Sequence, residues 1–276
     1  MYMKLKDGKS KVLTLSYDDG VIQDKRLMAI FDRYGLKATF NINTGAYPAE
    51  NWERDASNLR MKLSEAQALY IGSGHEVAVH GLDHPFLEKL SSPQVITQVL
   101  QDRKNIESQY GTIARGMAYP FGTYNDQVID LLERCGICYS RTVHATGGFG
   151  FPEQWLTWHP TCHHEDPRLM ELAKTFVESK PRNHMDNWLF YVWGHSYEFD
   201  RGNNWQLIEE FAQFVGGKDD VWYATNIEVY DYLQAYERLQ FSADQTLVHN
   251  PSAVDVWFCN NHQTFCVRGG QTLQIK

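Results

Sequence analysis

The feature that most constrains the fold of this chain is an alternation, over residues 11–239, of short apolar runs with segments of helical periodicity. Such an alternation is typical of a parallel sheet with crossover helices. It predicts strands at 11–17, 37–42, 75–79, 116–119, 137–143, 188–193 and 221–224. It predicts helices at 23–34, 64–71, 92–110, 125–134, 167–178, 205–214 and 227–239. This pattern alone is compatible with a barrel or with an open, doubly wound sheet.

The ends of some predicted elements carry their own signals. Ser64 and Gln67 have the spacing of a helix capping box, while Pro93 and Gly111 delimit the long helix at 92–110. After residue 240 the pattern changes to short alternating runs, such as AVDVWF and QTFCVRG. We therefore expect one barrel-like domain at 1–240 and a small β appendage at 241–276 that packs on it.

Charge and hydropathy restrict the partners and the location. The net charge is −8, and there is no dense run of Lys or Arg, so neither nucleic acid nor a membrane surface is a favoured partner. No apolar stretch is long enough to span a bilayer. The N-terminal sequence MYMKLKDGKSKVLTL lacks the apolar core of a secretory signal. These features predict a cytoplasmic protein and leave its oligomeric state open.

The five cysteines show no spacing typical of a disulfide framework. Cys135 and Cys138 form a C-x-x-C pair that could act as a redox dithiol. The pair falls between a predicted helix and a predicted strand, so buried structural thiols are the favoured interpretation.

Reactive side chains follow several of the predicted strands directly. In β/α barrels, catalytic residues come from the carboxyl ends of different strands. The residues at these ends are Asp18, Asp19, His80, His84, Tyr119, Pro120, Phe121 and His195. Their convergence is more informative than any one of them, and it predicts a single site at one end of the sheet.

Asp18, Asp19 and Gly20 are also typical of a simple turn. Two adjacent carboxylates repel each other unless a cation or a proton relieves them. A metal bound to one carboxylate would leave the other free as a base.

His80 and His84 have the i, i+4 spacing of histidines on one helix face. Because Pro85 disfavours helical backbone at His84, we expect both on a loop instead. With one aspartate they make a two-histidine, one-carboxylate metal set, with zinc first and Fe, Co, Ni or Mn possible. His195 could be a buried core residue or a proton donor, and its place at the same predicted edge favours the second.

In this order the motifs resemble those of the polysaccharide deacetylase family, also called NodB-homology or family 4 carbohydrate esterases. The family motif Thr-Phe-Asp-Asp-Gly corresponds to Ser16-Tyr17-Asp18-Asp19-Gly20. The His-Ser/Thr-x-x-His motif corresponds to His80-Gly81-Leu82-Asp83-His84, and the late Leu-x-His motif to Trp193-Gly194-His195. The resemblance covers residues 11–239.

The resemblance implies a distorted β/α barrel that removes acetyl groups from an N- or O-acetylated carbohydrate. It implies that Asp18 is the general base, that His195 is the general acid, and that Asp19, His80 and His84 bind a divalent metal. A backbone N–H of the loop Tyr119-Pro120-Phe121-Gly122, that of Phe121 first, would stabilise the oxyanion. Trp193 and Glu198 are further candidates for substrate contact.

The third family motif, Arg-Pro-Pro-Tyr-Gly, is altered here, because Ala118 and Tyr119 precede Pro120. The missing arginine normally orients the base together with an Asp-Trp motif, and that motif is also not evident. Arg115 and Arg141 are the candidate replacements, and we favour Arg141 because the 137–143 strand would direct it into the barrel. An unrelated structural ion pair is the alternative.

The segment TWHPTCHHEDP brings together His159, Cys162, His163 and His164. A second metal site is conceivable, but histidines that line a substrate pocket are the favoured interpretation. Two other functions remain open: a metal-dependent amidase that cleaves a non-sugar C–N bond on the same scaffold, and a non-catalytic carbohydrate-binding protein. The complete set of Asp18, Asp19, His80, His84 and His195 argues against the latter.

Overall fold

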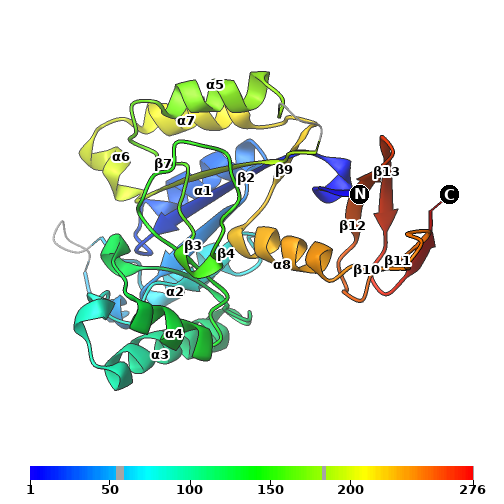
Figure 1. Cartoon of the computed structure of the whole chain (residues 1–276). Coiled ribbons are helices and arrows are strands. Elements are labelled where there is room, and N and C mark those ends of the chain that lie inside the picture. The colour runs from blue at the N-terminus through cyan, green and yellow to red at the C-terminus, as the bar shows by residue number, and fades with distance from the viewer. Residues whose placement is uncertain (54–58, 182–184, 276) are drawn as a thin grey trace.

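A curved parallel sheet forms the centre of the computed structural model, which describes residues 1–53, 59–181 and 185–275 (Figure 1). The strand order is β6-β5-β4-β3-β2-β8-β7, with β9 beside β2, and every pairing between these strands is parallel. The strands are β2 (Lys11–Asp18), β3 (Ala38–Ile42), β4 (Glu76–Val79), β5 (Gly116–Ala118), β6 (Tyr139–Arg141), β7 (Cys162–His163), β8 (Trp188–Gly194) and β9 (Val221–Tyr223). The predicted β/α barrel class is confirmed.

The central strand β2 is buried along its whole length, and between Leu13 and Tyr17 its apolar side chains alternate with the buried hydroxyls of Thr14 and Ser16. Its alternate side chains serve two cores. Leu13, Leu15 and Tyr17 pack in the large core beneath the helices, while Val12 packs in a second cluster with Trp158 and other aromatic side chains. The pleat of β2 therefore separates a core outside the sheet from one inside its curve.

The helices pack against the large core, except the last one, whose Val229, Tyr232 and Leu233 pack in the second cluster. The helices are α1 (Asp24–Arg33), α2 (Leu63–Tyr70), α3 (Ser92–Tyr110), α4 (Asp126–Arg134), α5 (Leu169–Glu178), α6 (Tyr197–Arg201), α7 (Trp205–Val215) and α8 (Asn226–Glu237). Helices α5 and α7 contact each other at one side of the molecule, and α3 and α4 at the other (Figure 1). The predicted helices are confirmed to within a few residues, and α6 is an additional short helix.

The His-rich segment bridges the two edges of the sheet. At one end the Trp158 N–H donates to the Ser140 carbonyl on β6 (2.9 Å). At the other end the Thr161 N–H donates to the Tyr191 carbonyl on β8 (2.8 Å), and β7 continues this pairing. No strand was predicted in this segment, because a strand of two residues is too short to show a period of two.

The C-terminal region forms two antiparallel sheets of three strands, β1-β12-β13 and β10-β11-β14. Their bounds are β1 (Tyr2–Lys4), β10 (Gln240–Phe241), β11 (Leu247–His249), β12 (Val256–Asn260), β13 (Gln263–Val267) and β14 (Thr272–Gln274). Ala235 in the last turns of α8 and Leu239 just after this helix pack against Val248 and Phe258 of these sheets. Strand β1 was not predicted, and it brings the N-terminus beside the C-terminal strands (Figure 1).

Local details of the helix ends differ from the predictions at one helix and agree at another. Glu65, not Gln67, closes the first turn of α2, where its carboxylate accepts from the Lys62 N–H (2.9 Å). Ser64 lies inside α2 and donates to Glu50 (2.5 Å). Gly111 ends α3 in the left-handed conformation, with φ of 66°, as a helix C-terminus requires.

Cys135 and Cys138 are free thiols, the first buried and the second half-buried. Burial raises the pKa of both thiols, that of Cys138 to about 12, so a reactive thiolate is disfavoured. No helix among the described residues is long and apolar enough to cross a membrane.

Asp24 is a fully buried carboxyl at the start of α1. It forms hydrogen bonds with the hydroxyls of Tyr70 (2.6 Å) and Ser196. Burial raises its pKa from 3.8 to about 7. Because its pKa is higher in the folded than in the unfolded state, its contribution to stability is complete below about pH 4 and is lost as the pH rises to about 7.

As Asp24 ionises, the unfolding free energy of the wild-type protein should fall between pH 4 and pH 7. We expect Asp24→Asn to reduce this fall by on the order of 4 kcal/mol, because an amide supplies the same donor and acceptor without a charge. Urea unfolding of both proteins at several pH values measures the effect. Equal slopes of unfolding free energy against pH would show that Asp24 ionises normally in the folded protein.

Candidate active site and metal centre

The site lies at the carboxyl ends of the parallel strands, where the fold gathers side chains from distant parts of the sequence. Asp18 ends β2 and Asp19 follows it, His80 follows β4, Arg141 ends β6, and His195 follows β8. Asp19 has a φ of 86°, a backbone conformation that is strained for a residue with a Cβ. This turn separates the two carboxylates, so that Asp18 faces Arg141 while Asp19 faces His80 and His84.

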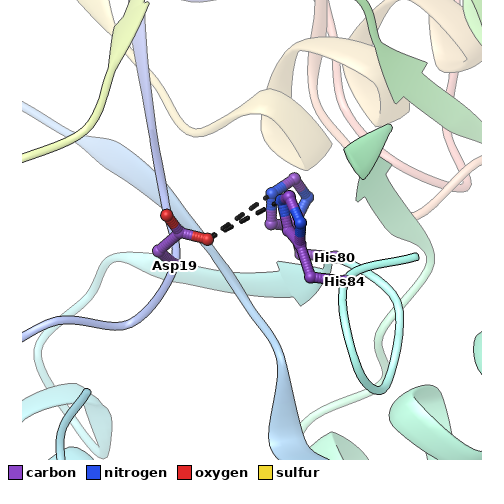
Figure 2. A group of neighbouring side chains, drawn as sticks. All are labelled: Asp19, His80 and His84. Atoms are coloured by element: carbon purple, nitrogen blue, oxygen red, sulfur yellow. Dashed lines mark ion pairs between the residues drawn. The ribbon is translucent and has the colours of Figure 1, made fainter. Parts of the chain in front are cut away.

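Asp19, His80 and His84 converge on one point (Figure 2). Asp19 Oδ1 lies 3.9 Å from His80 Nε2 and 3.8 Å from His84 Nε2. Both histidines are on a loop, as expected, and His84 has a φ of 58°. The sequence prediction of a two-histidine, one-carboxylate group thus corresponds to side chains that lie together.

The protonation of His80 fits metal binding. Its Nδ1 lies 2.8 Å from the Ala118 carbonyl, which can only accept, so the proton is on Nδ1 and Nε2 carries a lone pair. Nε2 is buried and has no hydrogen-bond partner among the described residues. Burial lowers the pKa of His80 to about 4. A neutral imidazole with a free, buried nitrogen beside a carboxylate is suited to bind a divalent metal.

Residues that the sequence analysis did not identify hold the histidine loop in place. The buried carboxylate of Asp102 accepts from the backbone N–H groups of His80 (3.1 Å) and Thr44 (2.8 Å). The Asn43 amide donates to the carbonyls of His80 and Gly81, both at 2.6 Å. These residues come from α3 and the end of β3, so no local motif marks them.

Arg60 is a second residue that was missed. Its guanidinium donates to Asp19 Oδ1 (3.0 Å) and to Asn43 Oδ1 (2.7 Å). It therefore holds the Asp19 carboxylate, which belongs to the candidate metal group, in one orientation. Its position just outside the predicted helix 64–71 gave no signal for this role.

Asp18 and Arg141 form a fully buried ion pair. Asn41 donates to the other oxygen of Asp18 (2.8 Å), and the guanidinium carbon lies 4.3 Å from the Trp193 ring centroid. Burial alone would raise the pKa of Asp18, but the charges of Arg141, His80 and His195 lower it to about 2. Of the two candidate arginines, the fold thus places Arg141 at the base, while Arg115 pairs with Asp231 near the surface.

His195 lies between Asp18 and Glu198. Its Nε2 is 3.9 Å from Asp18 Oδ2, and its Nδ1 is 3.3 Å from Glu198 Oε2. Burial alone would lower the pKa of His195, but the Glu198 and Asp18 carboxylates outweigh it and raise the pKa above its ordinary value. His195 is thus suited to carry a proton near neutral pH.

Three of the residues expected to contact substrate are not on an open surface. Glu198 is buried beneath His195, whose backbone N–H donates to it (3.0 Å). Tyr119 is buried and its hydroxyl donates to the Leu156 carbonyl (2.8 Å), and Trp193 lies against Arg141. Their burial places these three side chains beneath the surface of the site, contrary to the expectation of direct contact with substrate.

The loop after β5 differs in this respect. Pro120 is buried, whereas the Phe121 side chain is 49% exposed. The Phe121 ring stacks on Phe86 at a centroid distance of 3.8 Å and meets His84 edge-on at 4.4 Å. Phe121 thus extends an aromatic surface from the candidate metal ligands toward solvent.

The fold divides the His-rich segment. His159 forms a hydrogen bond with the Thr142 hydroxyl (2.6 Å), and Cys162 is in the apolar core. Within the part of the chain that the structure describes, only His163 and His164 of this segment approach a further candidate ligand, the Glu198 carboxylate. The four residues therefore do not form one site.

Two imidazoles and two carboxylates thus lie together at the carboxyl end of a barrel-like α/β sheet, the usual place for the reactive residues of β/α-barrel proteins. Residues 5–140 match the family model described as polysaccharide deacetylase. The chain belongs to the polysaccharide deacetylase family, as the motifs indicated.

Curated relatives support this assignment over part of their length. The peptidoglycan-N-acetylglucosamine deacetylase PgdA of Listeria monocytogenes is 29% identical over 123 residues, which are 44% of this chain and 24% of that protein. The uncharacterized protein YlxY of Bacillus subtilis is 26% identical over 107 residues, 39% of this chain and 30% of that protein. The chain thus matches less than a third of the length of either relative.

Solved structures show the same fold. A Mycobacterium smegmatis structure assigned to the polysaccharide deacetylases aligns with a TM-score of 0.58 at 15% identity, over 86% of this chain and 94% of that one. A family 4 carbohydrate esterase from Streptomyces lividans aligns with a TM-score of 0.50 at 16% identity, over 77% and 91%. At these identities the likeness concerns the fold alone.

Proposed function

We propose that this chain is a metal-dependent hydrolase that removes an acetyl group from an N- or O-acetylated carbohydrate. The observation that carries the proposal is the placement of Asp18, which lies within 4 Å of the candidate ligand His80 and the candidate acid His195. The relative PgdA, described as a peptidoglycan-N-acetylglucosamine deacetylase, supports an acetylated saccharide as substrate.

Asp19, His80 and His84 would hold the metal, and the free Nε2 of His80 is the observation that fits it. A bound divalent metal, with zinc first and Fe, Co, Ni or Mn as alternatives, would polarise the acetyl carbonyl and lower the pKa of a bound water. The Arg60 guanidinium keeps the Asp19 carboxylate oriented for this purpose.

Asp18 is the proposed general base. Its low pKa keeps it ionised, so the proton-accepting form is always present, and Arg141 and Asn41 hold both of its oxygens in fixed directions. Its Oδ2 faces His80 and His195, and is thus directed at the place where water and substrate would meet.

His195 is the proposed general acid. Its Nε2 points toward the same place, and Glu198 at its Nδ1 favours the protonated ring. It would donate its proton to the departing sugar amine or hydroxyl, which leaves acetate as the other product. The Phe121 backbone N–H is the proposed donor to the oxyanion.

Acetate release from a panel of acetylated oligosaccharides tests this function directly. The protein is stripped of metal, assayed, and assayed again after addition of zinc. We expect release only with metal present. If no sugar is deacetylated under any metal, the proposed carbohydrate activity is wrong.

A second candidate is a metal-dependent amidase that acts on a non-sugar C–N bond. The observation that favours it is the altered third motif, in which Ala118 stands where the family has arginine and an exposed Phe121 adjoins the site. Hydrolysis of simple acetanilides or N-acetylated amines in the same assay, without hydrolysis of sugars, would select this function.

Asp102→Asn should raise the zinc concentration needed for half-maximal activity by about tenfold. The carboxylate that accepts from the His80 backbone becomes an amide, which loses the charge that anchors the histidine loop. Asp83→Asn is the matched control, because Asp83 is exposed on the same loop and, among the described residues, forms hydrogen bonds only with Gln98. Equal zinc dependence of both variants would contradict a role for Asp102.

A further inference from the structure

We propose that His163, His164 and Glu198 form a second site for a divalent transition metal, separate from the Asp19, His80 and His84 group. Two imidazoles and one carboxylate are a ligand set for zinc and its first-row neighbours. The site lies beneath His195, at the junction of β7 with α6.

The ligand atoms stand at the spacing that such an ion requires. Glu198 Oε2 lies 3.1 Å from His163 Nε2 and 3.4 Å from His164 Nε2, and all three atoms lie within 4.8 Å of one another. Two ligands on a tetrahedral zinc ion, with bonds of about 2.0–2.1 Å, are roughly 3.3–3.4 Å apart. The two separations from Glu198 Oε2 are close to this edge length.

His164 gives an independent reason to expect a ligand. Its side chain has no exposed surface, and neither ring nitrogen has a hydrogen-bond partner among the described residues. Its Nε2 is close to the Glu198 carboxylate, but not aligned for a hydrogen bond. This is the geometry expected when the lone pairs of both groups point to a third atom between them. A buried polar atom left unpaired is costly, and a metal at this point would satisfy it.

The surroundings hold the His164 ring in one orientation. It stacks on Tyr17 at 5.7 Å with an interplanar angle of 12°, and on Phe199 at 4.2 Å with an angle of 24°. Gly194 makes room for it, because a Cβ there would lie 1.9 Å from His164 Nδ1. The glycine that precedes His195 thus has a use in placing a neighbouring imidazole.

His163 supplies the access to the site. Its side chain is 24% exposed, so an ion and a water ligand can reach the cluster from solvent. Its Nδ1 accepts from the exposed Glu165 N–H (3.1 Å). Coordination through Nε2 places the proton on Nδ1 and releases this N–H to water.

The two metal groups share no residue, and the His195 ring lies between them, with Nε2 toward Asp18 and Nδ1 toward Glu198. An ion on Glu198 would fix the carboxylate that adjoins His195. A metal at this site would therefore hold His195 in position through Glu198. The existence of the site does not depend on the proposed deacetylase activity.

Metal stoichiometry tests the proposal without reference to activity. The stripped full chain is dialysed against zinc, and bound metal is measured by mass spectrometry. We expect two equivalents in the wild type, one in His163→Gln, one in Asp19→Asn and none in the double variant. His159→Gln is the control, since this histidine is on the same segment but outside the cluster, and it should keep two.

Cobalt substitution of Asp19→Asn adds a readout that does not require a change in the cluster. A visible absorption band of tetrahedral cobalt, at one equivalent, is expected from the remaining site. Retention of all wild-type zinc in His163→Gln would overturn the proposal, as would an Asp19→Asn protein that binds no cobalt. A single wild-type equivalent that is lost in His163→Gln would support this site and contradict the Asp19, His80 and His84 group. None of these results depends on whether acetate is released from any sugar.

Discussion

Asp18→Asn is expected to lower turnover by roughly 10²–10⁴-fold while the protein still binds metal through Asp19, His80 and His84. The amide keeps the shape of the side chain and can still accept from Arg141, but it cannot take a proton from water. Initial rates of acetate release at saturating zinc, with bound metal measured on the same samples, give the result.

The control for this prediction is Asp83→Asn, an equally conservative change at an exposed aspartate between the two candidate histidine ligands. We expect it to retain wild-type turnover. An Asp18→Asn enzyme with near-normal rate would remove Asp18 from the role of base, whatever the metal content.

Arg141→Met is expected to destabilise the fold by about 3–5 kcal/mol, because it leaves the buried Asp18 carboxylate without its partner. Turnover should fall as well, since the base loses the group that orients it. A double-mutant cycle with Asp18 measures how much of the lost stability comes from this ion pair. In an Asp18→Asn background, Arg141→Met should cost clearly less stability, because no unpaired carboxylate remains.

Arg115→Ala is the matched control for Arg141. Arg115 pairs with Asp231, and both side chains are more than a third exposed, so its loss should cost less than about 1 kcal/mol. Urea unfolding of the single and double variants measures all four free energies. If Arg141→Met resembled Arg115→Ala in stability and rate, the buried pair would have no part in the site.

Much of this site could be predicted from the sequence because its residues follow strands directly. A short, mainly apolar run between turn residues has a local strand signal, and the residue after a parallel strand lies at the carboxyl edge of the sheet. Asp18, Asp19, His80 and His195 were located in this way, and their roles in catalysis and metal binding stay predictions. Arg141 was chosen over Arg115 by the same argument.

Other members of the site had no such signal. Asp102 is in the middle of a helix, Arg60 precedes another, and Asn41 is inside a strand. Each acts through a contact to a residue more than 20 positions away in sequence. Polar residues in such places are usually solvated or paired locally, so only the folded neighbours distinguish these three from the rest.

The sequence pattern by itself determined the alternation of strands and helices and the edge at which the reactive residues gather, whereas the barrel class followed from the resemblance of the motifs to a known family. Apolar periodicity and strand ends are properties of a local stretch of sequence, so they can be recognised without knowing which residues the stretch contacts in the folded protein. Tertiary structure alone decided that Glu198 is buried under His195, that Tyr119 is a core residue, and that residues 158–163 bridge the two edges of the sheet. These outcomes depend on which side chains meet across long separations in sequence, where burial and hydrogen bonding are settled by the packing of whole elements rather than by the preference of any one of them.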